Sequence, residues 1–374
     1  MREEERYMKQ AIRLAKKGGG WVNPNPAVGA VIVKDARIIG KGFHEYFGGS
    51  HAEVNAIGSA SAPVAGATLY VTLEPCIHQG KTGPCTPFII SQGIRKVVIG
   101  MKDPNPQVNG KGIRLLQEAG IEVVSGILEP EVRQMNESFI KFITTGMPFC
   151  TLKTAMTLDG KIATVNNASR WISGEESRNV VHELRHNNGA ILVGANTIIY
   201  DNPLLNTRRK AKKGKDPLKV IADTKGRIPT DARVLQHEPQ LVVLATTKLA
   251  KSQKMKELER KGVHVLICPE KEGRIDLRYL FHSLGIMGID SILLEGGSTL
   301  AFSAIREGLV DKVISFIAPK ILGGKSAPTP VGGEGFAEMD DAVQLHDIRI
   351  KKLGEDIMVE GYIGSMSQQV NGST

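Results

Sequence analysis

Four residues, His51, Glu53, Cys76 and Cys85, have types and spacing that could bind and use a metal ion. An imidazole and two thiolates can occupy three corners of a zinc tetrahedron, which leaves the fourth corner for a water molecule whose pKa the metal lowers to about 7. Glu53 follows His51 by two residues, so it cannot easily reach the same ion and stays free to carry protons. These residues predict an open, catalytic zinc site.

The order of these residues indicates the class of site. His51-Ala-Glu53, then Pro75-Cys76 and then Cys85 resemble the signature of the cytidine-deaminase-like superfamily, in which a non-ligand glutamate moves protons beside the zinc. That signature has two residues between its cysteines, whereas eight residues separate Cys76 from Cys85. Each element alone has an ordinary explanation, because a buried cysteine is usually a small apolar residue. All of them in this order favour the zinc site.

The bulk composition is that of a globular protein with two domains. The chain has 374 residues, 41% of them hydrophobic and 23% charged, and no apolar run is long enough to span a bilayer. The first residues do not have the basic and then apolar pattern of a signal peptide. Two of the four cysteines are assigned to metal, and Cys150 and Cys268 are expected to be buried thiols. This cysteine usage predicts a reducing, cytoplasmic location.

The formal net charge of +9 has three possible explanations: a nucleic-acid partner, a phosphorylated small substrate, or a merely basic surface. Aromatic residues make up only 5% of the chain and do not alternate with basic residues as in single-strand binders. The small phosphorylated substrate is therefore favoured, with no nucleic acid. Much of the charge lies in one predicted loop, at Arg208, Arg209, Lys210, Lys212, Lys213 and Lys215.

The elements that position the zinc residues alternate between strands and helices in the first half of the chain. Apolar spacing predicts helices at 3–17, 52–60, 84–93, 112–119 and 129–144, and strands at 28–33, 37–43, 68–72, 96–100 and 121–125. His51 and Cys85 then lie at helix starts, where the helix dipole favours a thiolate, and Cys76 follows a strand. This alternation predicts a three-layer α/β domain over 1–146.

The second half, 147–366, repeats the alternation with different sequences, and 367–374 is a polar tail. Its apolar runs predict buried central strands at 151–155, 190–193, 218–222, 241–245, 263–268, 291–294 and 313–318, with helices at 174–185, 249–261 and 277–284. No G-x-G-x-x-G motif follows a strand here. Glu295-Gly296-Gly297-Ser298 runs from a strand into a helix, which suits either a phosphate site or a plain turn.

Longer stretches resemble one family over nearly the whole chain. Thr154 to Lys161, Ala168 to Trp171 and Gly189 to Pro203 resemble the reductase domain of the bifunctional riboflavin-biosynthesis family, a zinc-dependent pyrimidine deaminase fused to an NADPH-dependent reductase. Its deaminase domain is matched by Asn25-Pro26, Val28-Gly29, His44, Thr72 to His78, Gly80 to Thr82 and Asp103 to Pro106. The resemblance implies a cytidine-deaminase-like domain followed by a dihydrofolate-reductase-like domain in a cytoplasmic homo-oligomer. It also implies deamination of 2,5-diamino-6-ribosylamino-4(3H)-pyrimidinone 5′-phosphate and then reduction of its ribosyl group to a ribityl chain.

The resemblance implies a set of contacts at each site. Substrate contacts are expected from Asn25, His44, His78, Lys81 and Asn105 in the first half, and from Ser169, Arg185, Leu204, Arg208 and Glu295 in the second. NADPH contacts are expected from Ala155, Trp171, Thr197, Asp201, Thr224, Gly297, Ser298, Thr299, Leu300, Ala301, Phe302 and Ser303.

Ordinary alternatives stay open at some of these positions. Lys81 could be an exposed surface lysine, and Trp171 could pack in the core. His44 is set aside as a metal ligand because a fourth protein ligand would close the site to water. Lys153 faces inward from its strand and is expected to polarise or protonate the sugar. The rival functions are a nucleic-acid deaminase and a structural protein stabilised by zinc.

Overall fold

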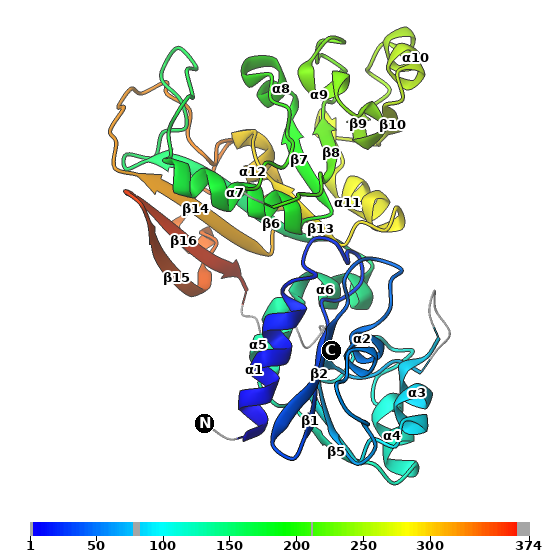
Figure 1. Cartoon of the computed structure of the whole chain (residues 1–374). Helices are drawn as coiled ribbons and strands as arrows, with labels where there is room; N and C mark the ends of the chain where they lie inside the picture. Colours follow the sequence, from blue (N-terminus) through cyan, green and yellow to red (C-terminus); the bar gives the residue numbers. More distant parts are fainter. Residues whose placement is uncertain (1–2, 78–82, 211, 365–374) are drawn as a thin grey trace. The chain divides into compact units, whose positions relative to one another are not determined.

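The computed structural model describes residues 3–77, 83–210 and 212–364. The chain divides into two compact units, Met1–Thr145 and Gly146–Thr374. Each unit has its own hydrophobic clusters and its own large sheet, and each is described separately below (Figure 1). None of the helices within the described ranges is long and apolar enough to cross a membrane.

The first unit is built on a five-stranded sheet in the order β2-β1-β3-β4-β5. Strand β1 pairs antiparallel with β2 and β3, and β3, β4 and β5 are parallel. The strands are β1 (Gly29–Lys34), β2 (Arg37–Phe43), β3 (Thr68–Leu73), β4 (Lys96–Met101) and β5 (Glu122–Ser125). The helices are α1 (Glu3–Ala15), α2 (Ala52–Gly58), α3 (Cys85–Ser91), α4 (Lys111–Glu118), α5 (Glu129–Met135) and α6 (Glu137–Thr145).

Helices cover both faces of this sheet. Alternate residues of one strand point to opposite faces, so Ile32 packs in one cluster with α2, α3 and α4, whereas Val31 packs in another with α1, α5 and α6. The two groups of helices lie on opposite sides of the strands in Figure 1. The predicted three-layer α/β arrangement is therefore confirmed.

The helix predicted over 129–144 is interrupted at Asn136, between α5 and α6. Asn136 is buried, and its side-chain amide bonds both backbone groups of Ala27: its oxygen accepts the N–H at 2.8 Å and its nitrogen donates to the carbonyl at 3.2 Å. These two hydrogen bonds to a loop distant in the sequence account for the interruption of the helix at Asn136. The spacing of apolar residues gives no sign of them.

The second unit contains a nine-stranded sheet in the order β10-β9-β8-β7-β13-β6-β14-β16-β15, together with a two-stranded hairpin, β11 and β12. Its strands are β6 (Phe149–Thr157), β7 (Ala190–Gly194), β8 (Leu218–Ala222), β9 (Val242–Thr246), β10 (His264–Ile267), β11 (Glu270–Lys271), β12 (Arg274–Ile275), β13 (Ser291–Leu294), β14 (Lys312–Ala318), β15 (Leu345–Leu353) and β16 (Asp356–Ile363). Its helices include α7 (Glu175–Asn187), α8 (Ala195–Asp201), α9 (Arg233–Gln236), α10 (Ser252–Arg260), α11 (Leu277–Ile286) and α12 (Ser298–Arg306).

Two features of this sheet differ from the sequence prediction. The run at 263–268 was expected to be a buried central strand, but β10 is an edge strand that pairs with β9, and both its end residues, His264 and Ile267, are exposed. The antiparallel hairpin β15–β16 was not predicted at all. Most of β15 is exposed and its sequence, LHDIRIKKL, is strongly charged, so it lacks the apolar run that marks a buried strand.

Candidate active sites

The three predicted metal ligands converge in the first unit. His51 directly precedes α2, Cys76 follows β3, and Cys85 is the first residue of α3. Nδ1 of His51 lies 3.2 Å from Sγ of Cys85 and 3.5 Å from Sγ of Cys76. Nitrogen and sulfur ligands of one tetrahedral zinc ion should be about 3.6 Å apart, so this donor set fits zinc closely.

Glu53 lies beside this cluster and is buried, with 3% of its surface exposed. Burial raises its pKa to about 7, and the nearby Cys76 adds to the effect, whereas His51 opposes it. The carboxyl group is thus separated from bulk water and adjacent to the three ligands. It can exchange a proton with a molecule bound at the cluster without being a ligand itself.

Two of the predicted substrate residues, Asn25 and His44, contact each other next to the metal ligands. The amide nitrogen of Asn25 lies 3.3 Å from Nε2 of His44, and Nδ1 of His44 lies 3.1 Å from the Ser50 carbonyl oxygen. The rings of His44 and His51 are 5.5 Å apart. Both ring nitrogens of His44 have partners outside the cluster, so this histidine lies beside the ligands and not among them.

Asn105 belongs to a turn that a buried carboxylate organises. Glu74 accepts hydrogen bonds from the backbone N–H groups of Asp103 at 3.1 Å, Gly110 at 2.9 Å and Ile113 at 3.2 Å. Asn105 itself accepts from the backbone of Gln107 at 3.0 Å. Glu74 precedes Cys76 by two residues, but a single carboxylate at a strand end gave no sequence signal of this organising role. His78 and Lys81 lie outside the described residues.

The second unit contains a cavity of about 540 Å³ beside the carboxyl ends of β7 and β13. Ten of the residues predicted to contact substrate or cofactor line it: Ser169, Thr197, Asp201, Thr224, Gly297, Ser298, Thr299, Leu300, Phe302 and Ser303. Ser169 and Asp201 are joined by a hydrogen bond of 2.8 Å from the hydroxyl to the carboxylate. Residues from four separate parts of the second half are therefore brought together around one space.

The glycines at the start of α12 allow two backbone segments to approach each other at the cavity wall. Gly296 and Gly297 have φ angles of +158° and +89°, and a Cβ on Gly297 would lie 3.5 Å from the Cα of Gly194. The N–H of Gly194 donates to the Gly296 carbonyl at 3.2 Å. Because these positions are glycines, the backbone after β7 and the backbone after β13 can pack directly against each other. Helix α12 then starts beside the cavity.

Three of the residues predicted to contact NADPH do not line this cavity. Ala301 is buried in the core cluster between the sheet and α11, and half-buried Ala155 packs against the small cluster around Phe316. Trp171 is 64% exposed, with the guanidinium of Arg178 over its ring at 4.6 Å, so it is not a core residue either.

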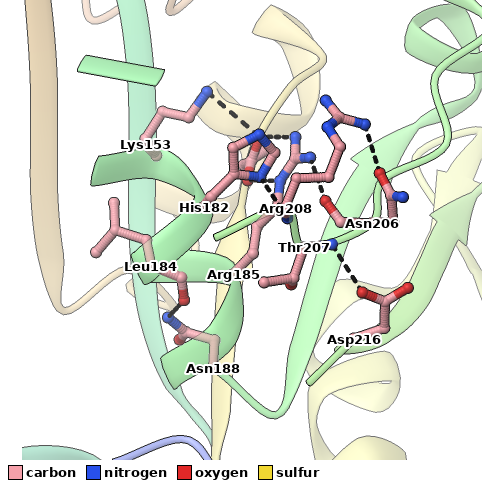
Figure 2. Close-up of polar contacts among 10 residues, drawn as sticks. Lys153, His182, Leu184, Arg185, Asn188, Asn206, Thr207, Arg208 and Asp216 are labelled. Carbon is pink, nitrogen blue, oxygen red and sulfur yellow. Dashed lines mark hydrogen bonds and ion pairs between the residues drawn. The ribbon is translucent and has the colours of Figure 1, made fainter. Parts of the chain in front are cut away.

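Glu295 connects two cations in a buried ion-pair group next to the β13 end. Arg185 of α7 forms two hydrogen bonds of 2.8 Å with its carboxylate, and Nζ of Lys153 lies 3.3 Å from it. Burial alone would raise the pKa of Glu295, but Arg185 and Lys153 bring it down to about 2. Figure 2 shows Lys153 and Arg185 converging on this region, with the Arg208 side chain nearby and directed to Asn206.

Arg208 extends this positive region, as the sequence predicted for one member of the basic run. Its Nη1 donates to the side-chain oxygen of Asn206 at 2.6 Å, and Arg185 donates to the Asn206 backbone carbonyl at 3.0 Å. Leu204 is half-buried in the same segment. Arg185 and Lys153 share the buried carboxylate of Glu295. Arg208 forms no ion pair with a carboxylate among the described residues, so this region has an excess of positive charge.

The cavity also has four basic residues that the sequence did not indicate: Arg227, Lys271, Arg274 and Arg306. Lys271 and Arg306 are paired with Glu307 and Glu272, at 3.5 and 2.6 Å. The four basic residues come from a loop, the β11–β12 hairpin and the end of α12, so no single sequence motif contains them. Four acidic residues line the same cavity: Asp201, Glu272, Glu307 and Glu334. The cavity wall therefore carries charges of both signs, and the basic side chains among them can contact a phosphate group.

Comparisons with known proteins agree with this division into two sites. Residues 1–101 match the family model of the cytidine and deoxycytidylate deaminase zinc-binding region, and residues 148–359 match that of the RibD C-terminal domain. The riboflavin biosynthesis protein RibD of Actinobacillus pleuropneumoniae is 46% identical over 95% of this chain and 94% of its own length. The RibD protein of Aquifex aeolicus is 43% identical over 95% of this chain and 97% of its own length.

Solved structures give the same result. Acinetobacter baumannii RibD has a TM-score of 0.88 at 37% identity and covers 97% of this chain and 99% of its own. A Thermotoga maritima protein described as a diaminohydroxyphosphoribosylaminopyrimidine deaminase and 5-amino-6-(5-phosphoribosylamino)uracil reductase has a TM-score of 0.86 at 40% identity, with the same coverage.

Proposed function

The chain belongs to the RibD family of riboflavin biosynthesis proteins, and we propose that it performs the two reactions of that family with the residues described above. It is a bifunctional enzyme that joins a zinc-dependent deaminase to an NADPH-dependent reductase. Its substrate is 2,5-diamino-6-ribosylamino-4(3H)-pyrimidinone 5′-phosphate, and its product is 5-amino-6-ribitylamino-uracil 5′-phosphate. We assign the deaminase to residues 1–146 and the reductase to residues 147–366; the tail 367–374 lies outside the described residues.

In the deaminase half, His51, Cys76 and Cys85 would hold zinc, and the ion would supply Lewis acidity for the attack of water on the ring carbon that bears the amino group. Glu53 would take one proton from that water and give it to the ring nitrogen. It would then take the second proton, from the new hydroxyl group on the ring carbon, and give it to the amino group, which leaves as ammonia while the carbonyl forms. Asn25, His44 and Asn105 orient the pyrimidine and its ribose phosphate. His78 and Lys81 are proposed to do so from the loop between the two cysteines.

In the reductase half, NADPH supplies the hydride, and the protein holds the cofactor and the sugar in position. The cavity beside β7 and β13 suits the cofactor, because ten predicted contact residues line it and its basic side chains can face phosphate groups. Lys153, whose Nζ lies 3.3 Å from Glu295, is the proposed proton donor to the sugar. Arg185 and Arg208 are the proposed partners of the substrate phosphate.

The observation that carries this proposal is the presence of both sites in one chain. A nucleic-acid deaminase would explain the zinc cluster with Glu53, but not the cavity beside β7 and β13. A structural zinc site would need a fourth protein ligand, and the candidate group at this site contains, among the described residues, His51, Cys76 and Cys85 alone.

We further propose a cytoplasmic homo-oligomer. All four cysteines are free thiols, which suits a reducing compartment. The proposal of an oligomer rests on the family alone.

A coupled assay tests the proposed function. Purified protein with the phosphorylated diaminopyrimidine substrate should release one ammonia and oxidise one NADPH per product molecule, and its metal content should be one zinc per chain. Ammonia release without NADPH oxidation would contradict the reductase assignment. Deamination of a tRNA in place of the small substrate would support the rival function.

A further inference from the structure

His182 is a residue of α7 to which the proposed function assigns no role, and it lies within the cationic region of the reductase half. Figure 2 shows its ring among Lys153, Arg185 and Arg208. Its Nδ1 lies 3.2 Å from the backbone nitrogen of Arg208 and accepts the hydrogen bond from that N–H group. The histidine thus links α7 to the residue proposed to bind the substrate phosphate.

The direction of this hydrogen bond fixes the protonation of the ring. A backbone N–H group can only donate, so Nδ1 of His182 must be an unprotonated acceptor, and the ring is neutral with its proton on Nε2. Burial lowers the pKa of His182 to about 4, and Arg185 and Arg208 add to the effect, while Glu295 and the Asn206 carbonyl oppose it. A neutral ring therefore holds the Arg208 backbone without adding a further positive charge.

The same helix holds the segment around Arg208 at other points. Nδ1 of His186, one turn after His182, accepts from the backbone N–H of Lys215 at 3.1 Å, and Glu183 accepts from Nε of Arg209 at 2.8 Å. Asp216 accepts from the backbone N–H of Thr207 at 2.7 Å. Of these hydrogen bonds, the one from the backbone N–H of Arg208 to His182 is the one that holds Arg208 itself. Arg208 has no carboxylate within ion-pair distance in the part of the chain that the structure describes.

We propose that His182 is a positioning residue of the reductase, which holds the Arg208 backbone so that the guanidinium groups of Arg208 and Arg185 together face a phosphate monoester on the substrate. This inference rests on the proposed function, because it takes the phosphorylated sugar as the ligand. His182 acts through Arg208 and makes no contact with the reacting carbon. Its loss should weaken binding of the phosphate and leave the hydride transfer step nearly unchanged.

Two substitutions with different geometry test this role in the full-length protein. In His182→Asn the amide oxygen can take the place of Nδ1, whereas in His182→Gln the amide reaches the position of Nε2 and cannot easily accept from the Arg208 backbone. We expect His182→Gln to raise the KM for the deaminated, phosphorylated intermediate about tenfold, as for the loss of one hydrogen bond, with kcat within about twofold of wild type. His182→Asn should stay within about threefold in KM.

Two controls separate positioning from general damage to the fold. With the dephosphorylated intermediate, wild type and His182→Gln should have the same KM, because the phosphate contact is absent. In an Arg208→Gln background, adding His182→Gln should cause no further loss. If His182→Gln and His182→Asn are equally impaired, or if the dephosphorylated compound shows the same KM increase, the positioning role is wrong. If wild type does not oxidise NADPH at all, the proposed function fails and the inference fails with it.

Discussion

The two sites of this chain are assembled in opposite ways. The metal ligands of the deaminase half lie within a short stretch, His51 and Cys85 being 34 residues apart, and helix starts and a strand end bring them together. The ion-pair group of the reductase half joins Arg185 of helix α7 to Glu295, which directly follows strand β13 and is 110 residues away in the sequence. One site is a local motif, and the other is a product of the fold.

The two sites also differ in the sign of the charge that they leave unbalanced. In the deaminase half, two cysteine thiols and the buried carboxyl group of Glu53 lie together, and such a group of side chains favours binding of a cation. In the reductase half, Lys153 and Arg185 share the buried carboxylate of Glu295, and Arg208 nearby forms no ion pair within the described residues, so that region favours an anion. We propose that each site takes a ligand of opposite charge, zinc at the first and a phosphate group at the second. This difference predicts that changes at one site leave the other intact.

Glu53→Gln should have the largest effect and should confine it to one half. Glutamine keeps the size of the side chain but cannot carry the proton, so ammonia release should fall by about 10²–10⁴-fold. NADPH oxidation with the already deaminated intermediate should stay within about twofold of wild type, because Glu53 lies in the other unit. Zinc content should also be unchanged, since Glu53 is not a ligand. Loss of metal, or of both activities, would contradict the separation of the sites.

Glu295→Gln should have the reverse effect. Removing the buried carboxylate leaves Arg185 and Lys153 without their shared partner, and breaking such a pair costs about 3–5 kcal/mol of unfolding free energy. We expect a reductase unit that unfolds at a clearly lower temperature and loses most NADPH oxidation, with ammonia release retained. Glu259→Gln, at an exposed position of α10, is the matched control and should change neither measurement. Equal losses in both variants would show that the ion-pair group has no special role.

The same carboxylate predicts how acid affects the reductase unit. The pKa of Glu295 falls from an ordinary value of 4.5 to about 2 in the folded state. Because the folded pKa is the lower one, the stabilisation is present above about pH 4.5 and is lost as the pH falls toward 2, by roughly 3 kcal/mol in total. Urea unfolding across this range should show the loss in wild type and a flatter profile in Glu295→Gln. Identical profiles would contradict the assigned pKa.

The contrast between the sites also explains what the sequence could and could not predict. The zinc ligands and Glu53 were found because their spacing is short and their residue types are specific to metal chemistry. The fold class was predicted because apolar runs mark the buried strands. The charged hairpin strand β15 and the break at Asn136 escaped because exposed strands and long-range hydrogen bonds leave no apolar pattern. The cavity residues Arg227 and Arg274 escaped because tertiary structure alone brings them together.

Gly297→Ala should have a smaller effect, limited to the reductase half. An alanine at φ +89° is strained by about 1–3 kcal/mol, and its Cβ would also lie 3.3 Å from that of Leu300 at the cavity wall. Gly288→Ala is the matched control, since φ is +80° there and a Cβ would meet no atom within 4 Å. Both variants should unfold several degrees below wild type, but only Gly297→Ala should raise the KM for NADPH. A similar KM increase in Gly288→Ala would exclude a local effect on the cofactor site.

The smallest effect is expected from Lys210→Gln, which removes an ion pair from the same basic segment as Arg208. Lys210 pairs with Glu175 at the start of α7, but both side chains are largely exposed, at 70% and 64%. Solvent and salt screen such a pair, and holding two long side chains together costs conformational entropy, so its net contribution is near zero. The melting temperature should change by less than about 2 °C, and the KM for the phosphorylated intermediate by less than about twofold. Steady-state kinetics and thermal unfolding at low and high salt measure both. A loss comparable to that of Glu295→Gln would mean that net charge of the segment, and not burial around Glu295 and Arg185, controls the reductase site.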